Sequence, residues 1–242
     1  MQGKKTIIFN KGVSEKAMIN NYNVIEMIKR DPEPYENELP KWGRPILEFV
    51  GKHYFLEADQ IIDNLFGSGN RNARKKLFEL SQKDFLVRYE LFCEDKEAPI
   101  IGYTLSEKGT KITRYILPRL SINRAQEYII ANEFYFMRGH LLDGWKLLNG
   151  SQLLMAELLI DKEKFGLWAP REEDTRIKSL LTESMGLQGL IIIAPDETAL
   201  AIISTRVEAL NLNKPIYYTI DSELEILRYM DEGGLRVLTD TE

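Results

Sequence analysis

The sequence predicts a mixed α+β protein in which a helical unit closed by a β-hairpin is followed by an α/β domain. Short amphipathic helical patterns precede a strand–tip–strand pattern that ends near Leu105. The apolar run Gly189–Ala194 is typical of a strand buried on both faces, and helical and strand patterns alternate after it. We therefore expect a parallel βαβαβ segment, set in a small sheet, in the C-terminal half.

Charge also divides the chain. Residues 41–120 carry 14 basic and 11 acidic side chains, whereas residues 121–242 carry 12 basic and 20 acidic ones. This difference suggests two modules with different partners, and nucleic acid suits only the basic one. We expect an N-terminal arm over residues 1–40, a first domain over residues 41–120, and an α/β domain over residues 121–242 that begins with a linker helix at about 122–138.

The composition, 44% apolar and 29% charged over 242 residues, is that of an ordinary globular protein. Cys93 is the sole cysteine, and His53 and His140 are the sole histidines, which excludes a cysteine zinc cage and a His-rich metal site. No apolar run approaches the roughly 20 residues that span a bilayer, and the N-terminus does not resemble a signal peptide. We expect a cytoplasmic protein with no membrane contact and no cofactor.

The N-terminal arm contains one helical pattern. Val13, Ala17, Ile25 and Ile28 are the apolar positions of a helix expected over residues 13–30. Two prolines in the four residues that follow end it, because proline lacks a backbone donor and disfavours helix in the residue before it. We interpret this arm as a mobile or docking segment.

Three helical patterns lie over residues 44–83. Pro45 suits the first turn of the first helix, and apolar side chains recur at helical spacing over Ala58–Leu65 in the second. The turn Gly67–Gly69 ends the second helix, and the third runs over about Asn70–Lys83. Two short helices and a Gly-containing turn before a third helix outline a helix-turn-helix.

The third helix has an apolar face and an opposite cationic face. Cations near the N-terminal end are where a recognition helix meets base edges and phosphates. Cations on the outer face of a surface helix are also commonly just solvated, so both interpretations stay open. The cations of this helix that we assign to DNA are Arg71, Arg74, Lys75 and Lys76.

A strand, a polar tip and a second strand follow the third helix. Residues 86–92 alternate apolar and polar with period two, residues 93–98 are polar, and residues 99–105 form the returning strand. Ser106 then caps a helix that reaches about Leu117. The whole pattern predicts a winged helix-turn-helix.

The wing adds two candidate phosphate contacts, Arg88 on its first strand and Lys108 in the helix after it. Its tip carries three acidic side chains and one lysine between Glu94 and Glu97. Because the DNA backbone is a row of negative charges, an acidic tip disfavours insertion into a groove. We expect the tip to lie away from the DNA backbone or to contact protein.

The C-terminal half is expected to begin with an aromatic-rich helix over residues 121–138. We assign Tyr128, Phe134 and Phe136 either to the core or to a dimer contact. The further expected elements are strands near 145–148 and at 156–160, a helix at 171–185, a strand at 189–194, a helix at 197–210, a strand at 215–220, a helix at 222–230 and a strand at 235–238.

Carboxylates follow two of these strands, at the edge of the sheet where ligands usually bind. Asp196 and Asp221 suit either a carboxylate-lined site or helix capping, with Asp196 as an N-cap and Ser222 with Glu225 as a capping box. We favour capping. The sequence has no Gly-rich phosphate loop, no nucleotide fingerprint and no nucleophile elbow, so we expect no catalytic residue, no metal ligand and no enzyme.

The motif order resembles the replication-relaxation family of Gram-positive plasmids and mobile elements. The likeness rests on the R-x-x-R-K-K-L-x-x-L run Arg71–Leu80, on the wing phrase Tyr103–Gly109 and on the helix Ile122–Arg138. It implies a C-terminal domain similar to a restriction endonuclease, whose strand-borne acid-x-Lys holds a divalent metal. Asp161–Lys164 is the nearest charge cluster and lacks that pattern, so we expect a degenerate domain that serves structure, oligomerisation or protein docking.

We therefore expect a DNA-binding protein of a plasmid, phage or integrative element that acts in replication, transfer or transcriptional control. Double-stranded DNA is the expected partner, the expected form is a homodimer, and the acidic C-terminal domain is a candidate surface for a protein partner. Two other classes stay open: a metal-dependent nuclease or nicking accessory with a diverged site, and a protein-interaction adaptor whose winged helix no longer binds DNA.

Overall fold

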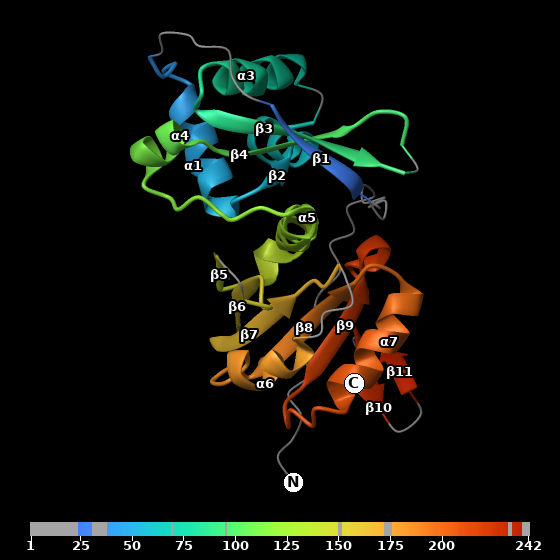
Figure 1. Cartoon of the computed structure of the whole chain (residues 1–242). Coiled ribbons are helices and arrows are strands. Elements are labelled where there is room, and N and C mark those ends of the chain that lie inside the picture. Colours follow the sequence, from blue (N-terminus) through green and yellow to red (C-terminus); the bar gives the residue numbers. More distant parts are fainter. Residues whose placement is uncertain are drawn as a thin grey trace. The chain divides into compact units, whose positions relative to one another are not determined.

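The computed structural model describes residues 24–30, 38–68, 70–94, 96–149, 152–171, 176–231 and 234–238, and of Ile25 and Arg71 only the backbone. The protein is a mixed α+β structure with two sheets (Figure 1). Contacts divide it into two compact units. The N-terminal unit comprises Tyr22–Phe136 and Leu147–Met155, and the C-terminal unit includes Met137–Lys146 and Ala156–Glu242.

The N-terminal unit contains a four-stranded antiparallel sheet with the order β1-β3-β4-β2. Its strands are β1 (Val24–Arg30), β2 (Leu56–Glu57), β3 (Leu86–Cys93) and β4 (Ile100–Leu105). The helix expected over residues 13–30 is wrong for residues 24–30, which form the strand β1. Residues 13–23 of that expected helix lie outside the described residues. Pairing with the free edge of β3, a contact distant in sequence, overrides the local helical pattern.

Helices cover this sheet, with α3 packed on β3 and α1 and α4 packed on β4. They are α1 (Gly43–His53), α2 (Ala58–Ile61), which continues as the π-helical turn η1 (Ile62–Phe66), α3 (Arg71–Gln82), α4 (Glu107–Thr113) and α5 (Ile122–Arg138). An expected helix end and an expected helix cap are confirmed. Gly67, with φ of 82°, ends η1, and the Ser106 hydroxyl caps α4 by accepting from the Gly109 amide at 3.0 Å. Only glycine adopts such a φ at little steric cost.

A buried amide anchors α5 to the rest of the N-terminal unit. Asn132 Nδ2 donates to the carbonyl oxygens of His53 and Phe55, at 3.0 Å each. Its Oδ1 lies 2.6 Å from His53 Nδ1. Because the amide nitrogen faces two acceptors, Oδ1 is the acceptor here and His53 Nδ1 carries the proton, and burial lowers the pKa of His53 to about 4, which keeps the ring neutral at pH 7.

This anchoring corrects the expected boundary at residue 120, because α5 belongs to the N-terminal unit up to Phe136. Gln60 of α2 adds a further link, with its Nε2 2.8 Å from the carbonyl oxygen of Ile129. Tyr128 and Phe134 are fully buried, so they are core residues and offer no surface for a dimer contact. Phe136 packs against the same core and stacks on Phe49, with 5.9 Å between the ring centroids.

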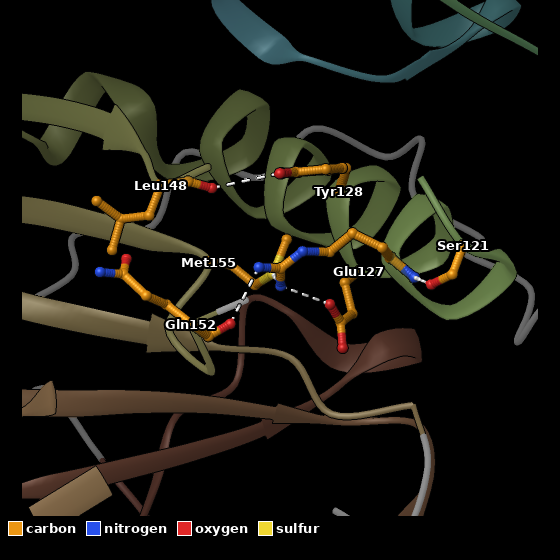
Figure 2. Close-up of polar contacts among 7 residues, drawn as sticks. Ser121, Glu127, Tyr128, Leu148, Gln152 and Met155 are labelled. Atoms are coloured by element: carbon orange, nitrogen blue, oxygen red, sulfur yellow. Dashed lines mark hydrogen bonds and ion pairs between the residues drawn. The ribbon is translucent and has the colours of Figure 1, made fainter. Parts of the chain in front are cut away.

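Arg124 fastens the Leu147–Met155 segment to α5. Figure 2 shows the residues that it contacts, Glu127, Gln152 and Met155. Its guanidinium donates to Glu127 at 2.7 Å and to the Gln152 carbonyl at 3.0 Å, and it also contacts the Met155 sulfur. The Tyr128 hydroxyl donates to the carbonyl oxygen of Leu148, at 3.3 Å. A buried cation is tolerable here because a carboxylate and a backbone oxygen replace the water that it loses.

The C-terminal unit contains a seven-stranded mixed sheet, larger than the expected one, with the order β11-β10-β9-β8-β7-β6-β5. Figure 1 shows α6 and α7 on the same face of this sheet. The strands are β5 (Gly144–Leu147), β6 (Ala156–Ile160), β7 (Glu163–Trp168), β8 (Gly189–Ala194), β9 (Ile216–Ile220), β10 (Arg228–Asp231) and β11 (Gly234–Val237). The helices are η2 (Gly139–Leu141), η3 (Ile177–Ser179), α6 (Leu180–Glu183), α7 (Glu197–Glu208) and η4 (Asp221–Glu223).

The parallel βαβαβ segment is present, but it begins one strand earlier than expected. β7, β8 and β9 are parallel neighbours, whereas β10 and β11 follow as antiparallel strands. The sequence analysis missed β7 because Asp161 and Lys162, with φ of 51° and 65°, form a tight two-residue hairpin turn without glycine.

One expected helix of this unit is wrong, and another is shorter than expected. The helix expected at 222–230 is replaced by η4 and β10, and no capping box forms at Ser222. Of the helix expected at 171–185, η3 and α6 cover only residues 177–183. Extension of the sheet through β10 and β11 satisfies more backbone groups than a short isolated helix does. None of the described helices is both long enough and apolar enough to cross a membrane.

We predict that His53 makes the protein less stable in acid. Burial lowers the pKa of His53 to about 4, whereas an unfolded chain titrates this group near 6.5. Between these values the unfolded state binds more protons, so the free energy of unfolding falls as the pH decreases through this window. The full shift corresponds to about 3 kcal/mol. Urea denaturation of the wild type and of His53→Gln at pH 7.5, 6, 5 and 4.5 measures the difference.

The advantage of the wild type over His53→Gln should shrink steadily over this series. The matched control is His140→Gln, since His140 is exposed and its replacement should leave the pH dependence unchanged. A constant difference between the wild type and His53→Gln at every pH would contradict the assignment.

Candidate nucleic-acid interface

One face of α3 is buried in the core, and this orients the opposite face outward. Ala73, Leu77 and Leu80 are fully buried in the core of the N-terminal unit. The Asn70 side chain caps α3 by accepting from the Asn72 amide at 3.1 Å, which fixes where the helix begins. Arg74 and Lys75, which are exposed, therefore lie on the side away from the core.

Lys75 is the cation of this face that the structure leaves most accessible. Its side chain is exposed, and no ion pair or hydrogen bond to it is found among the described residues. Phe78 and Gln82 lie within about 60° of Lys75 around the helix axis at 100° per residue. Phe78 is 50% exposed and Asn72 is exposed as well. Arg71 is the first residue of α3, and its side chain lies outside the description.

Arg74 forms an exposed ion pair with Asp59 of α2. The two side chains are 59% and 58% exposed. Exposed pairs of this kind contribute about 0–1 kcal/mol. The guanidinium can therefore exchange Asp59 for another anion at little cost.

Two other cations assigned to DNA, Lys76 and Lys108, are held against aromatic rings within the protein. The Lys76 ammonium lies over the rings of Trp42 and Phe66, 5.5 and 5.3 Å from their centroids. Lys108 Nζ lies 4.2 Å from the centroid of the Phe85 ring, and it donates to a backbone carbonyl at 3.3 Å. Cation–π contacts of this kind anchor the lysine stem on the aromatic surface and draw its charge away from solvent.

Arg88 is held in an ion cluster that the sequence analysis did not anticipate. Arg88 Nη1 lies 2.6 Å from Glu90 Oε1, and Arg30 of β1 binds the other oxygen of Glu90. The hydrogen bond from Arg30, with support from Arg88, lowers the pKa of Glu90. The sequence analysis missed this cluster because it expected a helix over residues 13–30, and Arg30 reaches Glu90 only when its segment is a strand paired with β3.

The tip between β3 and β4 remains acidic in character. Glu94 and Glu97 are exposed and Lys96 is half-buried, while Asp95 lies outside the described residues. The hairpin therefore presents negative charge at its end and keeps Arg88 in its ion cluster. Of the predicted site, Arg74 and Lys75 form the part whose described side chains are exposed.

A second polar cluster lies at the carboxyl edge of the parallel strands. Arg171, after β7, binds Asp221, after β9, through two hydrogen bonds of 2.8 and 3.0 Å. Both side chains are 5% exposed. Burial raises the pKa of Asp221 to about 6 even though Arg171 favours its charged form. Asp196 caps α7 as expected, with its Oδ1 2.8 Å from the Ala199 amide.

Further ion pairs lie at this edge. Arg228 of β10 binds Glu197 at 3.1 Å and also binds Glu223. Within the described part of the chain, no three His, Cys, Asp or Glu side chains are grouped so that they could hold a metal ion. The charge cluster Asp161–Lys164 forms the hairpin turn and the first two residues of β7.

No protein-family model matches the chain, and no curated protein matches it. A solved structure, the crystal structure of protein VC1899 from Vibrio cholerae, aligns with 75% of this chain and 48% of its own chain, at 11% identity and a TM-score of 0.29. This chain therefore spans about half the length of that protein. A likeness at this TM-score carries no argument about fold or function, and the comparisons do not bear on the resemblance to the replication-relaxation family.

We predict that the Arg171–Asp221 pair is strongly coupled. Arg171→Met leaves a buried carboxylate without its counter-charge, which should cost about 3–5 kcal/mol in urea denaturation at pH 7.5. The double variant Arg171→Met/Asp221→Leu removes both charges and should be more stable than Arg171→Met alone. The loss in Arg171→Met should also shrink as the pH falls toward 6, because without Arg171 the pKa of Asp221 lies higher still and the isolated carboxyl takes up a proton before that of the wild type does.

The control is Lys178→Met, which removes an exposed cation of the same unit and should change stability by less than about 0.5 kcal/mol. Additive losses in the double variant would show that the two side chains stabilise the sheet edge independently.

Proposed function

We propose that this chain binds double-stranded DNA through the outward face of α3. The observation that carries the proposal is the pair Arg74 and Lys75, two exposed cations on a capped helix whose other face is held rigidly in the core. A helix fits the major groove of duplex DNA, and phosphate contacts from lysine and arginine supply most of the sequence-independent affinity.

The order of elements supports the assignment of a winged helix-turn-helix. In that fold a helix and a short strand precede the helix-turn-helix, and a β-hairpin follows the recognition helix. Here α1, β2, α2 and α3 precede the β3–β4 hairpin, and β2 pairs with β4 through Leu56 and Tyr103. The break at Gly67 separates α2–η1 from α3. The resemblance to the replication-relaxation family extends the proposal to replication, transfer or transcriptional control of a mobile element.

The proposed contact is confined to α3. Lys76, Arg88 and Lys108 are engaged within the protein, and the hairpin tip is acidic, so the wing adds little phosphate affinity. A contact this small gives modest affinity for each copy, and two copies on two half-sites raise it. We therefore propose a homodimer in the bound state. Since Tyr128 and Phe134 are buried, its contact must lie on other residues.

We predict that Arg74→Ala/Lys75→Ala weakens DNA binding and lowers its salt dependence. Each lost phosphate contact should reduce the slope of log affinity against log salt by about 0.9. The slope should therefore fall by about two if both cations contact phosphates. Fluorescence anisotropy with a labelled duplex between 50 and 200 mM salt measures this slope, and the thermal midpoint should hardly change because both side chains are exposed.

The matched control is Lys111→Ala/Arg119→Ala, which removes the same charge from exposed positions of the same unit outside α3. It should reduce the slope much less. Equal slopes for the wild type and the α3 variant would refute the proposed interface.

We also predict that Asp59→Asn strengthens binding. The carboxylate of Asp59 competes with phosphate for Arg74, and its removal frees that guanidinium. We expect about a two- to fivefold gain in affinity at 50 mM salt that shrinks as salt increases. Glu48→Gln is the control, because it breaks the similarly exposed Arg44–Glu48 pair on α1 with the same change of charge. An equal gain in both variants would indicate a general charge effect.

A second candidate function is docking to a protein partner. The acidic hairpin tip and the internally engaged cations favour it, because they leave few cations for phosphate. Absence of any shift with random duplex at 50 mM salt would support this function over DNA binding.

The nuclease alternative is tested by incubating the protein with Mg²⁺ and supercoiled plasmid. Cleavage that disappears in Asp161→Ala, Glu163→Ala, Asp196→Ala or Asp221→Ala would establish hydrolysis.

A further inference from the structure

Phe78 is an exposed aromatic residue in the middle of the outward face of α3. Half of its surface is accessible, whereas its sequence neighbours Leu77 and Leu80, on the inward face of α3, are fully buried. No aromatic or cation–π contact of the Phe78 ring is found among the described residues. A phenylalanine at this position leaves a large apolar surface in water that α3 does not need for its own packing.

The side chains around Phe78 are polar or positively charged. Lys75 lies one turn before it on the same face and Gln82 one turn after it, while Glu79 is neutralised by Lys83 at 3.3 Å. Asn72 is exposed near the start of the helix. The face therefore combines one apolar group with cations and amides, whereas the core of a protein–protein interface is a larger apolar patch depleted in lysine.

Duplex DNA offers a surface complementary to this combination. In the major groove, phosphates line both rims, and the floor carries hydrogen-bonding base edges and one apolar group, the C5-methyl of thymine. Amide side chains form hydrogen bonds with adenine. An aromatic side chain can contact the methyl group of the thymine in the same base pair. Charge complementarity thus favours DNA as the occupant.

We propose that Phe78 is a specificity-determining residue that contacts a thymine methyl group in the major groove. This inference rests on the DNA-binding function proposed above. It goes beyond that function because Arg74 and Lys75 give affinity without base preference, whereas Phe78 selects A·T over G·C pairs at one position in each half-site.

The test uses the full chain and a duplex selected from a random pool by the wild type. Thymines of the selected duplex are replaced one at a time by deoxyuridine, which removes the methyl and keeps every base-pairing atom. For the wild type, one thymine in each half-site should weaken binding by about three- to fivefold on replacement, the effect of burying one methyl group. Phe78→Ala should bind the thymine duplex more weakly by a similar factor or more, and should no longer distinguish thymine from uracil there.

Two controls accompany this test. Ile116→Ala truncates another exposed apolar side chain of the same unit, 66% accessible, and should keep the full thymine preference. Phe78→Leu keeps an apolar side chain and should retain part of the preference. The thermal midpoint of Phe78→Ala should match that of the wild type, because the ring is half in solvent.

The outcomes separate this inference from the function on which it rests. If the wild type binds no duplex, DNA binding itself fails. If the wild type binds and Phe78→Ala keeps the same thymine preference, DNA binding stands and the role of Phe78 is overturned. A change of oligomeric state in Phe78→Ala, measured by light scattering, would also overturn it, because it would place the ring in a contact between copies.

Discussion

The buried amide of Asn132 is the contact on which the N-terminal unit depends. It satisfies the carbonyls of His53 and Phe55, where the chain leaves α1 and enters β2, and it accepts from the imidazole of His53. Without the Asn132 amide, the buried His53 imidazole would lose this hydrogen-bond partner and the His53 carbonyl would keep only the Phe55 amide, at a cost that a unit of this size does not easily bear. The short strand β2 pairs with β4, and α2 begins directly after β2, so the position of α3 follows from this contact.

The same organisation separates the two kinds of positive charge in this unit. Lysines and arginines that lie close to aromatic rings or to β3 are used within the fold, as Lys76 and Arg88 are. Among the described residues, Arg74 and Lys75 on the outward face of α3 have no competing ion-pair partner except the weak one that Asp59 offers to Arg74. The net charge of a region is therefore a poor guide to its capacity for phosphate, since accessible and engaged cations contribute equally to the total.

Much of the fold could be predicted from local pattern alone. The apolar periodicity of α3, the caps at Ser106 and Asp196 and the buried strand β8 depend on neighbours in sequence and are confirmed. The strands β1 and β7 could not be found in this way, because pairing partners distant along the chain or a turn without glycine define them. For the candidate site, sequence identified the cationic face of α3, but it could not distinguish a free lysine from one resting on an aromatic ring.

The strand β1 has a consequence for solubility. Without it, β3 would end the sheet with a row of unpaired amide and carbonyl groups, which invites a second molecule to add a strand. β1 occupies that row, and its own exposed side chains include Glu26, Lys29 and Arg30. The register between Val24 and Glu26 is also irregular, which interrupts a flat pairing surface. β1 therefore protects the hairpin from edge-to-edge aggregation, and a variant that began at residue 41 would lose that protection together with Arg30, the ionic partner of Glu90.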